Sequence, residues 1–163
     1  MAKQTTQKQN VEQLRVNEKK WTKPLMESGW SVLPNIIIEK QAALGLDPLD
    51  MNIILHLVQY WWVADNLPHP SVATIAEAIG VTPRTIQKRI KAMEELGLME
   101  REERRHTKYG SVTNLYSFNG LIKAVAPFAE EKLAKKAENQ AAEKARVKSK
   151  KPKLVVDNKP KEP

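Results

Sequence analysis

The stretch PSVATIAEAIGVTPRTIQKRIKAMEELGLMERE, residues 70–102, decides the fold of this chain. Its first part predicts a short helix, because Ser71 is a residue type that caps helix N-termini and apolar side chains follow at helical spacing. The side chains expected to face inward are Val72, Ile75, Ala76 and Ile79. Gly80 then supplies the positive φ that a tight turn requires, and Val81 fills the corner. The pattern predicts a helix that ends abruptly in a turn.

A second helix is predicted directly after that turn. Thr82 is a capping residue, and Pro83 suits the first helical position, where no helical hydrogen bond needs its missing N–H. The apolar stripe of this helix consists of Ile86, Ile90, Met93 and then Leu96. Gly97 is expected to end the helix in the left-handed conformation. Two helices joined by a short glycine turn form a helix-turn-helix.

The face opposite this stripe carries long nitrogen donors and no carboxylate before Glu94. In the major groove of duplex DNA, arginine pairs with guanine and glutamine with adenine, whereas lysine suits phosphate. The residues predicted to contact DNA from the second helix are Thr82, Arg84, Thr85, Gln87, Lys88 and Lys91. From the helix before the turn, Ser71 and Thr74 are expected to join them. The alternative is an ordinary solvated helix face.

Two strands are predicted after Gly97, at residues 98–105 and 112–118, because β-branched and aromatic residues are enriched there and a glycine marks the bend. Such a hairpin forms a wing beside the two helices. The basic residues expected to reach a minor groove or nearby phosphates are Arg104, Arg105 and Lys108. The acidic residues of the same segment are Glu100, Glu102 and Glu103. They leave an alternative in which pairing with neighbours occupies some of the arginines.

Upstream, residues 47–50 indicate a helix start, with a capping aspartate, a proline at the first helical position and a second acid. The helix predicted to follow, through residue 62, is the most apolar in the chain. Its one polar stripe consists of Asn52, His56 and Gln59. Such a helix is central to the core. Its Trp61 and Trp62 serve either the core alone or the core plus a dimer contact.

The predicted organisation is one small domain with tails. Its parts are a flexible N-terminal tail at residues 1–20, the domain at 21–126, an exposed helix at 127–147 and a disordered basic tail at 148–163. A helix over residues 36–44 is expected to lead into the domain and to stop at Gly45. Asn119 and Gly120 are expected to close the hairpin, and Pro127 to interrupt the final helix.

Charge is distributed unevenly along the chain, whose net charge is +8. Residues 29–80 carry one Lys or Arg against five Asp or Glu, whereas residues 81–123 carry nine against five and residues 124–163 carry eleven against six. Clustered positive charge favours a phosphate-rich partner, because each neutralised phosphate releases counterions. Nucleic acid is therefore the leading expected partner.

No catalytic or metal-binding pattern is visible. The chain has no cysteine, which excludes disulfides, thiol nucleophiles and thiolate-held metals. His56, His69 and His106 lack metal-ligand spacing, and the six glycines are too dispersed for a phosphate loop. We therefore expect no cofactor, no metal and no enzymatic activity. The N-terminus lacks the apolar stretch of a secretory signal, and no run approaches a membrane span, so a soluble cytoplasmic protein is expected.

The order of these elements resembles the winged helix-turn-helix family of phage and plasmid replication proteins and bacterial transcriptional regulators, over roughly residues 46–125. The resemblance rests on short motifs that occur together and in order: Pro70-Ser71, Thr74-Ile75-Ala76, Gly80-Val81-Thr82, Arg84-Thr85-Ile86-Gln87, Leu96-Gly97-Leu98 and Asn114 to Ile122. It implies a mainly α fold with a small β-hairpin wing, and a recognition helix from Pro83 that enters the major groove. Pro83 itself removes one contact that a polar residue would make.

Three functions follow from this interpretation. The first is a sequence-specific double-stranded DNA-binding protein that regulates transcription, acting as a dimer on a two-fold site. The second is a replication or partition initiator of a plasmid or phage, with basic tails that recruit replication or transcription machinery. The third is a protein-interaction adaptor that uses the Trp61-Trp62 pair as an exposed anchor.

Overall fold

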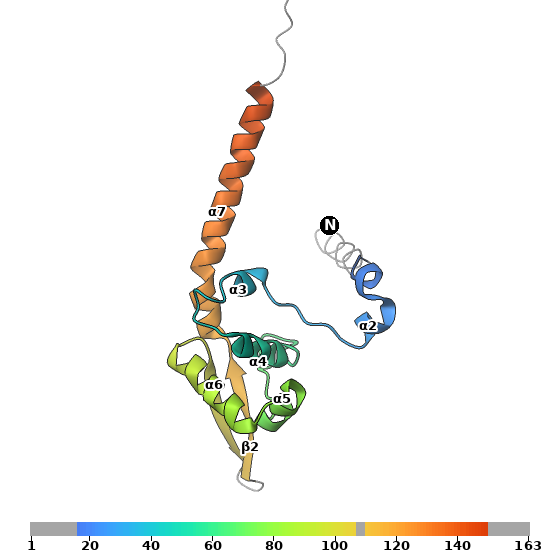
Figure 1. The fold of residues 1–163 in the computed structure, drawn as a ribbon, viewed down its shortest axis with the longest axis vertical. Coiled ribbons are helices and arrows are strands. Elements are labelled where there is room, and N and C mark those ends of the chain that lie inside the picture. Colours follow the sequence, from blue (N-terminus) through green and yellow to red (C-terminus); the bar gives the residue numbers. More distant parts are fainter. Residues whose placement is uncertain (1–15, 107–109, 150–163) are drawn as a thin grey trace, which may run out of the picture. The chain divides into compact units, whose positions relative to one another are not determined.

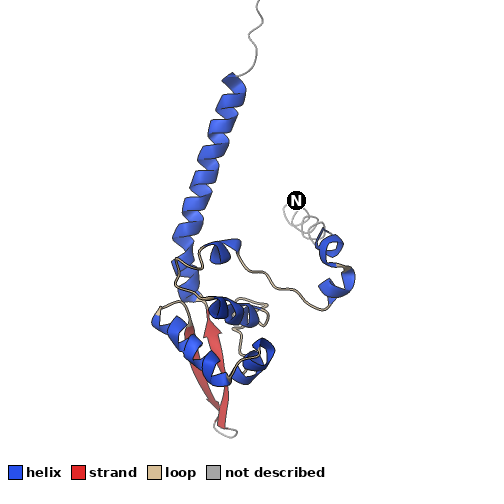
Figure 2. Cartoon of the chain, in the orientation of Figure 1, coloured by secondary structure: helices blue, strands red, loops and turns tan. Residues whose placement is uncertain are grey.

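The computed structural model describes residues 16–106 and 110–149. Chain contacts divide it into two compact units, Met1–Val125 and Ala126–Pro163. Figure 1 shows the labelled elements and Figure 2 their secondary structure. In chain order they are α2 (Lys23–Glu27), α3 (Asn35–Glu39), α4 (Pro48–Val58), α5 (Val72–Ile79), α6 (Pro83–Glu95), β1 (Glu100–His106), β2 (Gly110–Ser117) and α7 (Asn119–Ser149). A mostly helical unit followed by an antiparallel two-stranded hairpin is a winged helix-turn-helix, as predicted.

Helix α4 begins where the sequence predicts. The Asp47 carboxylate accepts a hydrogen bond from the Asp50 backbone N–H (2.8 Å), and the Asp50 carboxylate accepts one from the Asp47 backbone N–H (2.9 Å). This reciprocal capping box has Pro48 at the first helical position.

The end of α4 was predicted wrongly. The helix stops at Val58, and the Trp61 backbone N–H bonds to the Val58 carbonyl (2.9 Å) in a tighter turn. The Trp61 ring then lies 5.7 Å from the ring of Phe118, measured between centroids. Trp61 and Trp62 therefore belong to the loop after the helix, because tertiary packing overrides the apolar periodicity.

Helices α5 and α6 form the predicted helix-turn-helix. Ser71 caps α5 and Thr82 caps α6, each accepting a hydrogen bond from the backbone N–H three residues later. Gly80 joins the helices with φ of 81° in the left-handed region. Helices α4, α5 and α6 contact one another around one core. Its fully buried side chains include Ile53, Ile54, Leu57, Ile75, Ile86, Ile90 and Met93.

Leu96 departs from the predicted stripe and is exposed. It follows the last residue of α6, and the chain then reverses at Gly97 with φ of 68°. Leu98 occupies the buried position instead, and its backbone N–H bonds to the Met93 carbonyl (3.0 Å). The reversal thus moves the apolar contact two residues along the chain.

The hairpin pairs β1 with β2 in antiparallel register, from Glu100 opposite Ser117 to His106 opposite Gly110. Leu98 and Met99 precede the first strand instead of belonging to it. Near the base of the hairpin, the Tyr116 backbone N–H bonds to the Pro68 carbonyl (3.0 Å). Burial raises the pKa of the Tyr116 phenol, so the residue is a neutral part of the core.

The predictions for Asn119, Gly120 and Pro127 were wrong. The first two residues lie in the first turn of α7 and do not close the hairpin. Pro127 lies inside α7 without ending it, two residues after the boundary between the two compact units. Gly120 is required by a close approach, since a Cβ atom there would lie 1.9 Å from the Gly97 carbonyl oxygen.

The predicted helix over residues 36–44 is shorter than expected. Helix α3 ends at Glu39, and Lys40 leaves helical geometry with φ of −106° and ψ of 12°. Turns continue to Gly45, which has the positive φ expected of it.

The predicted N-terminal tail, residues 1–20, is helical over its last five residues, 16–20; residues 1–15 lie outside the described part of the chain. Within the C-terminal unit, α7 continues to Ser149, beyond the predicted end of the last helix, and residues 150–163 also lie outside the described part.

Candidate nucleic-acid interface

Helix α6 separates an apolar face from a basic one. Its buried side chains are Ile86, Ile90 and Met93. Arg84, Gln87 and Lys88 are exposed, and within the described part of the chain no hydrogen bond or ion pair joins their side chains to another residue. These nitrogen donors are therefore available to a ligand from solvent.

Lys91 is exposed on the same helix but has a partner. Its Nζ lies 3.6 Å from a carboxylate oxygen of Glu95, one turn further along α6. Exposed pairs of this spacing contribute about 0.3–0.5 kcal/mol, so contact with a phosphate can replace this one.

The predicted hydroxyl contacts have structural roles at the helix N-termini. Thr82 Oγ1 accepts from the Thr85 backbone N–H (3.2 Å) and lies 2.9 Å from Thr85 Oγ1. Ser71 and Thr74 repeat the arrangement at α5, at 3.0 and 2.8 Å. Capping fixes both N-termini, whose partial positive charge attracts anions. These four hydroxyls therefore position the helices, and each keeps only part of its hydrogen-bonding capacity for DNA.

The sequence-based prediction missed the role of Arg89, which lies beside the predicted DNA-contacting residues of α6. It lies on α6 between exposed lysines, yet its guanidinium turns inward: Nε donates to one Asp50 carboxylate oxygen (2.8 Å) and Nη2 donates to the other. Nη2 also lies 2.7 Å from a carboxylate oxygen of Asp47. The hydrogen bond to Asp50 raises the pKa of Arg89, chiefly because the carboxylate favours the charged guanidinium.

This contact fixes the recognition helix against the start of α4. Asp50 is 0% exposed, so its charge depends on Arg89 and on the Asp47 backbone N–H for compensation. The available signal was the position of Arg89, three residues after buried Ile86 and four before buried Met93, which places it at the edge of the apolar stripe. Its partner, 39 residues away in the chain, gave no local signal.

The wing holds its arginines differently. Arg104 Nε donates to the Thr113 carbonyl (2.9 Å), and its Nη2 donates to the Thr113 hydroxyl (3.2 Å) across the hairpin. Arg101 pairs with Glu94 at the end of α6 (3.2 Å). The backbone of Arg105 belongs to β1, but its side chain lies outside the described part of the chain, as does all of Lys108.

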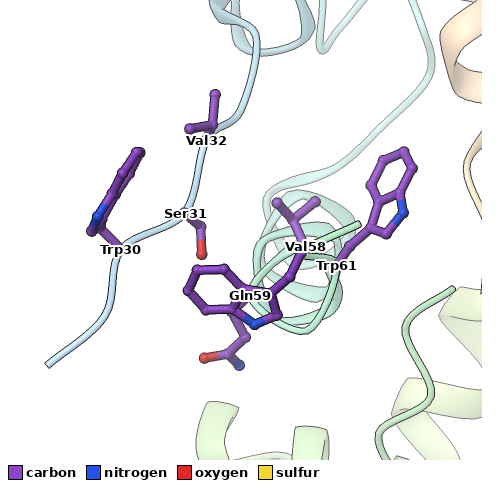
Figure 3. A pocket seen from close by; sticks show the side chains of 7 residues that line it. Trp30, Ser31, Val32, Val58, Gln59 and Trp61 are labelled. Atoms are coloured by element: carbon purple, nitrogen blue, oxygen red, sulfur yellow. The ribbon is translucent and has the colours of Figure 1, made fainter. Parts of the chain in front are cut away.

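A hollow of about 300 Å³ lies at the other end of α4 from the capping box. In Figure 3, Trp30, Ser31 and Val32 come from an extended segment, and Val58, Gln59 and Trp61 come from the end of α4 and the turn after it. Trp62 completes the lining. This surface is chemically unlike the outer face of α6, because it has no Lys, Arg, Asp or Glu among its lining residues.

The residues that the structure describes lack two features. They contain no group of three or more His, Asp or Glu arranged to hold a metal ion. None of their helices is long and apolar enough to cross a membrane. His56 lies beside Gln59, whose amide Nε2 donates to the ring Nδ1 (3.1 Å).

Residues 44–99 match the sequence model of a helix-turn-helix domain family. The match begins before α4 and ends at the residue before β1, so it covers the capping box, the glycine turn and the whole of α6. No curated protein sequence matches the chain. The chain therefore carries a helix-turn-helix domain, and a domain of this kind suggests DNA binding.

Proposed function

We propose that the chain binds a specific sequence of double-stranded DNA, with α6 in the major groove, and that it regulates transcription. The observation that carries the proposal is the exposed trio of Arg84, Gln87 and Lys88, which has no partner in the described part of the chain. The ion pairs on and beside α6 support it too, because Asp50 and Asp47 bind Arg89, Glu94 binds Arg101, and Glu95 pairs with Lys91. They leave the outer face positive.

The proposal gives the residues of this face different tasks. Arg84 and Gln87, near the N-terminus of α6, contact base edges, since their side chains can form paired hydrogen bonds with guanine and adenine. Lys88 and Lys91 contact phosphates, which fix the position of the helix without reading sequence. In the wing, Arg105, Lys108 and the unused guanidinium donors of Arg104 add phosphate or minor-groove contacts.

Selection of bound sites from a randomised duplex library tests these tasks. Replacement of Arg84 or Gln87 by Ala is expected to relax base preference at one position, by about 1–3 kcal/mol. Replacement of Lys88 or Lys91 by Ala is expected to weaken all sequences alike and to reduce the salt dependence. If Arg84→Ala and Lys91→Ala gave the same selection profile, the assignment of base and phosphate contacts would be wrong.

A salt titration separates DNA binding from an adaptor role. Each phosphate contact of a DNA-binding protein contributes about −0.9 to the slope of log affinity against log salt. A slope of several units for the intact chain is the expected result. A flat response would favour a protein-interaction adaptor that uses the exposed Trp62 as its anchor.

Initiation of replication is a second candidate. The observation in its favour is the C-terminal unit, where every side chain from residue 130 to residue 147 is exposed along α7. A helix that buries so little of itself suits the recruitment of another protein. Removal of residues 1–20 and 129–163 distinguishes the candidates: a regulator is expected to keep repression or activation, whereas an initiator keeps DNA binding but loses propagation of its replicon.

A further inference from the structure

The tryptophan-lined hollow at the end of α4 presents apolar surface that the domain itself does not cover. Trp62 and Val32, on two of its walls, are each 69% exposed, and Trp30 is 44% exposed. Trp61 is held in place by its ring contact with Phe118. The hollow is thus bordered by one fixed indole and two exposed ones.

The segment that precedes the hollow is equally uncovered. Helix α2 has no buried residue, although Leu25 lies within it and Trp21 lies two residues before its start. Trp21 is 54% exposed and Leu25 is 57% exposed. We call residues 21–29 the arm, because residues 30–32 already line the hollow. A five-residue helix gains little stability from its own hydrogen bonds, so apolar side chains on it normally require packing against another surface.

The charge of this region restricts the partner. Residues 28–38 and 51–64 contain no Lys, Arg, Asp or Glu, although the whole chain carries +8. In the arm, Lys23 pairs with Glu27 (3.6 Å), and Lys20 lies over the Trp21 ring. The hollow, which has no cation among its lining residues, offers no group that binds DNA phosphates. It does allow two positively charged copies of the same chain to approach each other, because their charges lie elsewhere.

We propose that the hollow and the arm form the contact surface for a second copy of this chain. The volume of about 300 Å³ accommodates an indole together with a smaller aliphatic side chain, and the arm exposes both kinds. In a two-fold dimer the arm of each protomer then enters the hollow of its partner, so the same surface serves on both sides.

The exposed area is sufficient for such a contact. The exposed apolar side chains of the arm, the hollow and the turn that carries Trp62 are Trp21, Leu25, Trp30, Val32, Tyr60, Trp62 and Val63. With about 150–250 Å² for each aromatic side chain, they offer on the order of 700 Å², close to the ~800 Å² per partner of a standard interface. The proposal is independent of DNA binding, since none of these residues belongs to α6.

The first test is sedimentation velocity of the full chain between about 1 and 100 μM, the range in which interfaces of modest affinity dissociate. The unmodified chain is expected to form a dimer. Trp62→Lys places a cation on the neutral surface and is expected to raise the dissociation constant about tenfold or more. Leu133→Lys is the matched control, because Leu133 is 67% exposed on α7 outside this region, and it is expected to dimerise normally.

Binding to a DNA duplex that carries a single half-site distinguishes the dimer proposal from the proposal that α6 binds DNA. Trp62→Lys is expected to keep that binding, which also shows that the variant is folded. A chain that stays monomeric throughout the concentration range overturns the proposal, as does a Trp62→Lys variant that dimerises as well as Leu133→Lys.

A second test does not alter the tryptophans. Because the chain has no cysteine, Ser31→Cys places a single thiol in the lining of the hollow, and Ala141→Cys places one on the exposed part of α7. The rate of maleimide labelling at position 31 is expected to fall as protein concentration rises, whereas the rate at position 141 stays constant. Equal and concentration-independent rates at both positions would overturn the proposal.

Discussion

Helix α6 and the hairpin wing are both rich in basic residues, but they hold them in opposite ways. On α6, Arg84 and Lys88 extend from the face opposite the core without partners in the described part of the chain. In the wing, Arg104 is bound to Thr113 across the two strands, and Arg101 is bound to Glu94. Whether a basic residue is available to DNA therefore depends more on the acceptors within its reach than on the number of positive charges in its segment.

Geometry explains this difference. Successive residues of a two-stranded hairpin lie close to the opposite strand, so a long arginine finds carbonyls and hydroxyls of its own chain. A helix satisfies its own backbone groups internally, and side chains opposite its buried stripe point to solvent. Arg89 is the exception on α6 that turns inward, because its position beside the stripe lets it reach Asp50, whereas Lys91 pairs with Glu95 at the surface.

The largest expected effect comes from removing the contact between Arg89 and Asp50. Arg89→Met leaves the fully buried Asp50 carboxylate without its guanidinium partner, and we expect the free energy of unfolding to fall by about 3 kcal/mol. Urea denaturation followed by circular dichroism measures the change. Lys88→Met, one residue earlier and exposed, is the control and is expected to change stability by less than about 0.5 kcal/mol.

A double-mutant cycle sharpens this test. If Arg89 and Asp50 compensate each other, Arg89→Met combined with Asp50→Leu destabilises the protein less than the sum of the two single changes. Strict additivity would mean that the pair does not stabilise the junction of α4 and α6.

A smaller expected effect, on the free energy of DNA binding, distinguishes α6 from the wing. Arg84→Ala is expected to cost about 1–3 kcal/mol of binding free energy on the preferred sequence and little on others. Arg104→Ala is expected to cost less than about 1 kcal/mol, equally on all sequences, because Thr113 already uses part of its guanidinium. Fluorescence anisotropy on matched and mismatched duplexes measures both. A change of base preference in Arg104→Ala would show that the wing also reads sequence.

The smallest effect concerns Lys91. Glu95→Gln removes its carboxylate partner and is expected to strengthen DNA binding at low salt by about 0.3 kcal/mol on every sequence. The gain should disappear in a Lys91→Ala background. If it persists there, Glu95 acts by repelling phosphates directly and not by pairing with Lys91.

What the sequence could predict depended on how local the determining contacts are. The caps at Asp47, Ser71 and Thr82 were predicted correctly, because each acts on a backbone N–H three residues away. The glycine turn and the hairpin were predicted for the same reason. The winged helix-turn-helix architecture follows from such local signals in the right order.

The errors lie where distant segments meet. Packing of Trp61 on Phe118 accompanies the early end of α4, and no pattern within the helix indicates it. Arg89 finds its partner on another helix. The pairing of Arg104 across the hairpin matches the alternative in which neighbours occupy some of the wing's arginines. The outer face of α6 could be identified from periodicity, but which of its cations are free depends on tertiary neighbours.

The contact between Gly120 and Gly97 has a consequence for relatives of this chain. Only a hydrogen atom fits between residue 120 and the Gly97 carbonyl oxygen, and the Leu121 backbone N–H bonds to the Leu98 carbonyl (2.8 Å) beside it. Proteins that share the architecture are therefore expected to retain glycine at this position whatever DNA they bind. Positions 84 and 87 are expected to diverge as the target sites do. The position that the shared fold requires therefore differs from the positions that determine which DNA sequence is bound.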